Sequence, residues 1–130
     1  MVIGAGACSQ TVPSLPADPP PLARYSEYPF GTETRVREVD QQTRILAALK
    51  PRFPDVRLLP RMIPAGGDWT ALGAAYQRAL PGWKKLPIGG DDPDGWRFAF
   101  TDGSHVVTVA GLRRAADRAT PVTIYTDLPS

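Results

Sequence analysis

The stretch that decides the fold reads Gly95-Trp96-Arg97-Phe98-Ala99-Phe100-Thr101-Asp102-Gly103-Ser104-His105-Val106-Val107-Thr108-Val109-Ala110. Two runs of β-branched and aromatic residues flank an Asp-Gly pair, which favours the positive φ angles of a two-residue type I′ turn. The sequence therefore predicts a β-hairpin with Asp102 and Gly103 as its loop. The facing residues that this loop implies are Thr101 with Ser104, Phe100 with His105, Phe98 with Val107, and Trp96 with Val109.

Side chains alternate between the two faces of a strand, so this hairpin has two unequal faces. One face carries Trp96, Phe98, Phe100, His105, Val107 and Val109. The other face carries Arg97, Ala99, Val106 and Thr108. The aromatic face needs a covering layer, because each buried ring removes roughly 150–250 Å² from water.

Two amphipathic segments can supply helices for that layer. The first helix is expected from Glu33 to Lys50, with Pro51 ending it and an apolar stripe made of Val36, Val39, Ile45, Leu46, Ala48 and Leu49. The second is expected from Trp69 to Leu80, with Asp68 as its N-cap and a stripe made of Leu72, Ala75, Tyr76, Ala79 and Leu80. We expect the second helix to cover the aromatic face of the hairpin.

Two further strands complete the predicted sheet. Residues 55–63 indicate an edge strand, because Pro60 cannot donate a hydrogen bond to a ladder. Residues 121–128 indicate the last strand, whereas residues 84–94 are expected to form a loop. The predicted fold is α+β: a two-layer domain over residues 33–130, with an antiparallel sheet of three to four strands covered by two helices. An extended Pro-rich N-terminal arm precedes it.

Composition and motifs exclude several classes of function. The chain has 130 residues, which suits one domain, and its net charge of +2 is too small to indicate nucleic-acid binding. No run approaches the ~20 apolar residues that a membrane helix needs. With one cysteine the chain has no intrachain disulfide and no cysteine-based metal cluster. Glycine-rich nucleotide-binding loops are absent, so we expect no cofactor.

Residues 1–32 are expected to be a signal remnant and a Pro-rich tether, largely disordered. The chain opens Met1-Val2-Ile3-Gly4-Ala5-Gly6-Ala7-Cys8, in which small residues lead into the only cysteine. This resembles the end of a bacterial lipoprotein signal peptide, where an acylated cysteine follows small residues; Ala5 stands where a leucine is usual. The resemblance implies that Cys8 carries a lipid that anchors the chain to a membrane of the bacterial cell envelope. The alternative is a free cysteine in a flexible terminus.

Residues 11–21 contain five prolines, which forbid a helix or a central strand. Such a segment is expected to be extended, at about 3.1 Å per residue, and would hold a folded domain away from a bilayer. The competing interpretation is a Pro-x-x-Pro ligand for an aromatic groove, formed by Pro13 and Pro16.

From Leu58 onward the chain also resembles small extracytoplasmic domains of bacterial lipoproteins. Those domains commonly combine a proline-containing strand, a helix, a Gly-Trp pair and three antiparallel strands. The residues that match are Leu59, Pro60, Tyr76, Leu80, Gly82, Trp83, Phe98, Val107 and Ile124. The resemblance implies a role in envelope assembly, possible partners among envelope proteins, and no catalytic residues.

Charged residues gather in two loops that form the candidate binding surface. One loop contributes Asp91 and Asp92, and the other contributes Arg113, Arg114 and Arg118. The acidic loop lacks the residue order and the closing glutamate of an EF-hand, so it indicates a solvated turn and not a metal site.

The only histidine, His105, is the one candidate for catalysis. Neighbouring side chains in a tight turn do not point at one another as a catalytic triad requires, and no nucleophile elbow is present. We therefore expect a lipid-anchored cell-envelope domain with a binding or assembly role and no catalysis of its own. The alternatives are a soluble small-ligand-binding domain or small enzyme that uses His105, and a soluble interaction module whose Pro-rich arm is the ligand.

Overall fold

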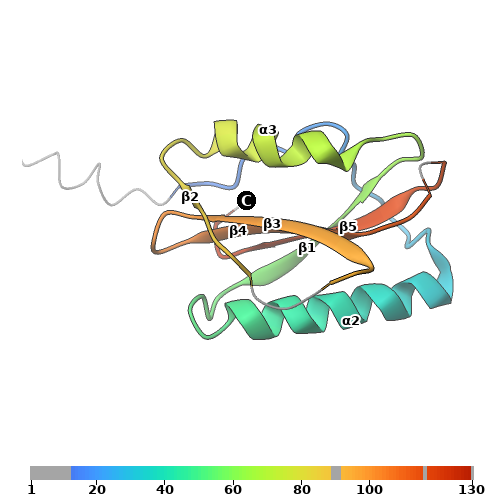
Figure 1. The fold of residues 1–130 in the computed structure, drawn as a ribbon, viewed down its shortest axis with the longest axis horizontal. Coiled ribbons are helices and arrows are strands. Elements are labelled where there is room, and N and C mark those ends of the chain that lie inside the picture. The colour runs from blue at the N-terminus through green and yellow to red at the C-terminus, as the bar shows by residue number, and fades with distance from the viewer. Residues whose placement is uncertain (1–12, 89–91, 116, 130) are drawn as a thin grey trace, which may run out of the picture.

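The structure, a computed structural model, describes residues 13–88, 92–115 and 117–129. Its elements are α2 (Gly31–Leu49), β1 (Arg57–Ile63), the 3-10 turn η1 (Trp69–Ala71), α3 (Leu72–Ala79), β2 (Lys84–Lys85), β3 (Gly95–Thr101), β4 (Val106–Leu112) and β5 (Thr120–Thr126). Within this part of the chain the strands form one antiparallel sheet in the order β1-β5-β4-β3-β2. One helix lies on each face of the sheet (Figure 1).

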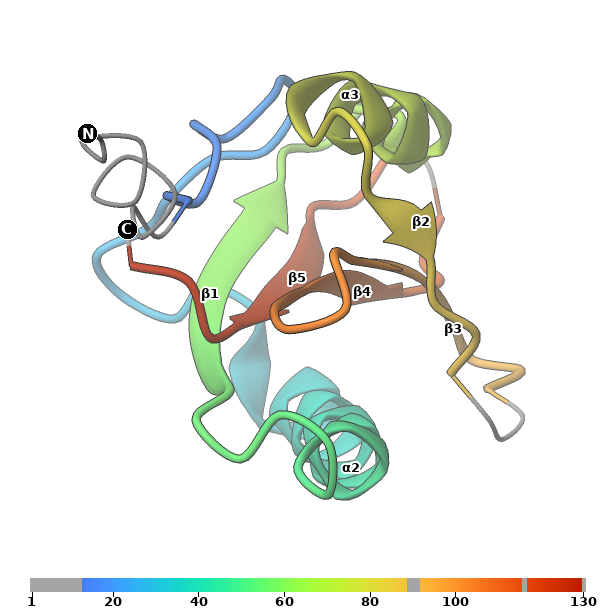
Figure 2. The ribbon, with the colours of Figure 1, turned by 90° about the vertical axis from the view of Figure 1, so that its left-hand side faces the viewer.

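The α+β class and the antiparallel sheet are confirmed, whereas the strand number and the layering are corrected. The sheet has five strands and not three to four, because Lys84–Lys85 pair with β3 in the expected loop. The helices lie on opposite faces and make three layers, as the end-on view in Figure 2 shows. Both faces of β4 and β5 are apolar and buried, so each face needs its own covering helix.

Each face of the sheet has a separate core. On the α3 face, the aromatic side of the hairpin packs against α3, as predicted, through Leu72, Tyr76, Trp96, Phe100, Val107 and Val109. On the α2 face, the core consists of Ile45, Leu49, Phe53, Val56, Val106, Ala110 and Tyr125. The sheet is therefore the central layer, and residues of alternating parity on β4 enter different cores.

The pairing register of β3 and β4 differs by two residues from the predicted one. Phe100 pairs with Val107 and not with His105. The Asp102 carboxylate accepts backbone N–H bonds from Ser104 at 2.8 Å and from His105 at 2.7 Å, which builds a four-residue loop. A shift of two residues leaves the side chains of β3 and β4 on their predicted faces, because strand side chains alternate with a period of two, whereas His105 lies in the loop and not in the strand.

The first half of α2 meets the sheet with polar side chains, contrary to the predicted apolar stripe. Val36 and Val39 are 65% and 42% exposed. The buried face carries Thr34, Glu38, Gln41, Ile45 and Leu49. Gln41 Nε2 donates to the carbonyl oxygen of Gly111 at 2.9 Å, so a hydrogen bond holds this half of the helix where the prediction placed apolar contacts.

The described part of the N-terminal arm, residues 13–30, packs along β1, in contrast to the predicted largely disordered tether. Ala23 forms an antiparallel bridge with Met62, and β1 is the edge strand that Pro60 predicted. Arg61 Nε donates to Asp18 Oδ2 at 2.7 Å. The folded unit therefore begins earlier than the predicted boundary after residue 32. Cys8 lies outside the described residues.

Candidate functional site

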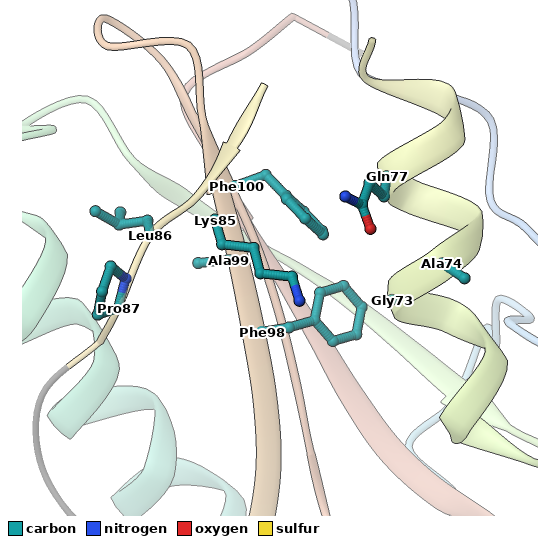
Figure 3. Close-up of a pocket in the computed structure, with 9 residues that line it drawn as sticks. All are labelled: Gly73, Ala74, Gln77, Lys85, Leu86, Pro87, Phe98, Ala99 and Phe100. Atoms are coloured by element: carbon teal, nitrogen blue, oxygen red, sulfur yellow. The ribbon is translucent and has the colours of Figure 1, made fainter. Parts of the chain in front are cut away.

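A cleft of about 550 Å³ lies between α3 and the edge of the sheet formed by β2 and β3 (Figure 3). It exists because β2 is two residues long and because α3 presents small residues on this side. At this position α3 and the β2–β3 edge of the sheet therefore do not pack directly against each other. The lining residues are Gly73, Ala74 and Gln77 from α3, Lys85, Leu86 and Pro87 from β2 and its continuation, and Phe98, Ala99 and Phe100 from β3.

The cleft combines an apolar floor with two polar groups. Phe98 is half-buried, whereas Phe100 is buried in the core beneath it. A Cβ atom at Gly73 would lie 3.8 Å from the Phe98 ring, so the missing side chain leaves space above that ring. Figure 3 shows the Lys85 ammonium and the Gln77 amide extending into this space. Among the described residues, Lys85 has no carboxylate partner.

The predicted arginines lie together where β4 ends and β5 begins. Arg114 donates to the carbonyl oxygen of Ala119 at 2.8 Å, and its guanidinium lies 5.7 Å from the centre of the Phe30 ring. Arg114 and Arg118 line a cavity of about 260 Å³, which Arg37 of α2 also lines. Sequence reasoning missed Arg37, because its place on a charged helix surface gave no reason to single it out.

The predicted acidic residues do not add to this surface in the described part of the chain. Asp91 lies outside the described residues. The Asp92 side chain is only 5% exposed, and its Oδ2 accepts a hydrogen bond from Gln41 Nε2 at 2.9 Å. Asp92 therefore fastens its loop to α2. Within residues 13–88, 92–115 and 117–129, histidine, cysteine and acidic side chains form no group that could hold a metal ion.

His105 forms a clamp between the hairpin loop and the end of β5. Its Nδ1 lies 3.1 Å from Asp127 Oδ2, and the other oxygen of that carboxylate accepts the backbone N–H of Val106 at 2.9 Å. Within the described chain, the ring has no hydrogen bond to a hydroxyl or thiol. This geometry supplies an oriented imidazole without an attached nucleophile, and it favours a structural role.

The sequence offered weak signals for the cleft. The small residues Gly73 and Ala74 stand in a helix, where glycine is unfavourable, and this is a reason to look for close approach or open space. Lys85 carried no signal, because a strand of two residues is too short for a periodic pattern. Phe98 was assigned to the core, whereas the structure leaves it half-buried and facing the cleft.

A comparison of the chain with protein-family models, curated proteins and solved structures finds no match. Among the described residues, every helix is too short or too polar to cross a lipid bilayer.

Proposed function

We propose that this chain is a non-catalytic binding domain of the bacterial cell envelope, anchored by a lipid on Cys8, whose ligand binds in the cleft between α3 and the β2–β3 edge. The observation that carries the binding role is the open space above the half-buried Phe98 ring, beside the ammonium of Lys85. Clefts of about 300–1,000 Å³ with apolar walls and few polar groups are the usual form of small-molecule sites.

The ligand class follows from the lining. Phe98 and Phe100 provide an apolar floor, so the body of the ligand is apolar. Lys85 provides one positive charge without a carboxylate partner in the described chain, so the ligand carries an acidic group. The proposed ligand is therefore a small amphipathic acid, and the Gln77 amide can bind a further oxygen of it.

Calorimetric titration with decanoate tests the cleft, with decanol as a probe of equal chain length and no charge. Gly73→Leu places a side chain over the Phe98 ring, so this variant should lose binding of both probes. Lys85→Gln should weaken decanoate binding by about three- to fivefold, because solvent screens an exposed lysine, and should leave decanol binding unchanged. Lys84→Gln, a neighbouring lysine that does not line the cleft, is the matched control.

Circular dichroism of each variant confirms that it folds. If decanoate does not bind, or if Gly73→Leu binds it as the unaltered protein does, the cleft is not the ligand site. If instead Lys84→Gln and Lys85→Gln weaken binding equally, the interaction is non-specific attraction of charge.

Support for the anchor comes from the small residues Gly6 and Ala7 before Cys8. The test is the mass of the protein expressed from its chromosomal gene. We expect an added mass of acyl chains on Cys8 that is lost in Cys8→Ser, together with membrane association that is lost in the same variant. Unmodified Cys8 in a protein that fractionates with the soluble material would refute the anchor and leave the cleft untouched.

A further inference from the structure

Three arginines meet at the N-terminal end of α2. Arg37 lies in the second turn of that helix, and Arg114 and Arg118 belong to the connection between β4 and β5. All three line one cavity of about 260 Å³, and residues 30–34 complete its wall. Of the carboxylates in the described chain, none forms an ion pair with any of the three.

The protein holds these like charges together at an electrostatic cost. Arg114 is fixed by its hydrogen bond to Ala119 O and by the face of the Phe30 ring. Burial lowers the pKa of the Arg114 guanidinium, and the nearby charges of Arg118 and Arg37 lower it further. The group is still charged at neutral pH, because arginine does not lose its proton in proteins. An anion bound between these side chains would remove their mutual repulsion.

The start of α2 adds hydrogen-bond donors to the same cavity. Phe30 is the N-cap residue, and no side chain caps the first turn. The first N–H groups of a helix have no partner within the helix and favour anions. Gly31 and Thr32 of this turn line the cavity. These donors assist, but the arginines define the charge of the ligand.

We propose that Arg37, Arg114 and Arg118 form a binding site for a phosphoryl group. The charged residues that line the cavity are three arginines and one acidic residue, Glu33, so the lining has a net charge of +2. A phosphate monoester carries about −1.5 to −2 charges at pH 7, which matches this excess. A single carboxylate would leave one positive charge unbalanced. One guanidinium group can also donate two parallel N–H hydrogen bonds to two oxygens of the same phosphate.

The position of the site favours a soluble phosphoryl compound over a lipid headgroup. Leu15 donates to Pro129 O, beyond the end of β5, whereas Arg118 precedes the start of that strand. Figure 1 likewise places the start of α2 and the start of the described arm at opposite ends of the molecule. An anchor before residue 13 would therefore hold the arginines away from its bilayer. This preference rests on the proposed anchor, whereas the site itself does not.

Calorimetric titration of the full chain with inorganic phosphate tests the site. Arg37→Gln and Arg118→Gln each remove one charge that lines the cavity, and each should weaken phosphate binding at least tenfold. Arg113→Gln removes the same charge from the same connection without lining the cavity, and should weaken binding less than twofold. The thermal midpoints of all three variants should not fall below that of the unaltered protein, because no described ion pair is lost and, in Arg37→Gln and Arg118→Gln, a repelling like charge is removed.

A second titration uses phosphatidylcholine vesicles that contain phosphatidic acid. Binding of free phosphate that Arg118→Gln abolishes and Arg113→Gln retains supports a site for soluble phosphoryl compounds. The same pattern with vesicles alone supports the site and assigns its phosphoryl group to a lipid. Equal losses in Arg113→Gln and Arg118→Gln, or no saturable binding to either probe, would overturn the proposal.

Discussion

Replacing Asp18 with asparagine measures how firmly the N-terminal arm belongs to the folded domain. Arg61 on β1 is 5% exposed, and its Nε lies 2.7 Å from Asp18 Oδ2. Asparagine keeps the shape of the side chain and removes its charge. The variant therefore leaves a buried guanidinium that retains its hydrogen bond to Pro60 O but has lost its counter-ion.

The expected cost follows from the burial of the pair. Removing one partner of a fully buried ion pair costs about 3–5 kcal/mol. The Asp18 side chain is 17% exposed, and asparagine still offers an oxygen acceptor, so we expect about 2–3 kcal/mol for Asp18→Asn. For a domain of this size each kcal/mol lowers the thermal midpoint by about 3–4 °C, which gives a decrease of about 6–12 °C.

Thermal unfolding at pH 7, followed by circular dichroism, measures this change. Combining Asp18→Asn with Arg61→Met should recover at least about 1 kcal/mol relative to the sum of the single variants, because contacting residues are not additive. Arg24 lies 3.6 Å from the same carboxylate but is 75% exposed, so Arg24→Gln should cost less than about 0.5 kcal/mol. A decrease below about 2 °C for Asp18→Asn, or an additive cycle, would refute the packing of the arm through this pair.

Further predictions concern the packing of the two cores, one on each face of the sheet. A Cβ atom at Gly111 would lie 2.5 Å from the Trp96 ring, so Gly111→Ala should lower the free energy of unfolding by about 1–3 kcal/mol. A Cβ atom at Gly73 would lie 3.8 Å from its nearest neighbour, so Gly73→Ala should stabilise the helix by up to about 1 kcal/mol. Urea unfolding of the two variants measures both changes in the free energy of unfolding. Burial raises the pKa values of Tyr76 and Tyr125 above the ordinary value of 10.0. The unfolded chain therefore loses these protons first, and the free energy of unfolding should fall as pH rises through 10. Absorbance at alkaline pH should show the phenolates of these two residues only when the protein unfolds.

The secondary structure of the hairpin and the helices could be predicted from local sequence patterns. Alternation assigns the faces of β3 and β4 correctly. Asp68 acts as an N-cap through a bond from Thr70 N at 2.9 Å, but it caps the 3-10 turn η1 that leads into α3 and not α3 itself. The loop length was wrong because it depends on one side chain. Asp-Gly suits a two-residue turn, but here the Asp102 carboxylate binds two backbone N–H groups beyond it and lengthens the loop.

The sites depend on contacts between distant segments, which local patterns do not contain. Arg114 and Arg118 were singled out as charged neighbours in one loop, but Arg37 joins them only because α2 packs against the end of β4, where Gln41 donates to Gly111 O. The burial of polar side chains on α2 also depends on contacts with distant segments. Gln41 is buried because Gly95 leaves room for its amide and Gly111 O accepts a hydrogen bond from it, whereas hydrophobic periodicity predicts that a glutamine is exposed.

The packed arm also determines the standoff between this domain and any membrane to which Cys8 is attached. A flexible tether through residue 32 would let the domain swing tens of ångströms from the bilayer. Because Leu15 is fastened to Pro129 by a backbone hydrogen bond, only about seven residue steps separate Cys8 from the first fastened residue. Their greatest span is roughly 25 Å. A domain anchored in this way would remain close to the lipid surface, within a limited range of heights.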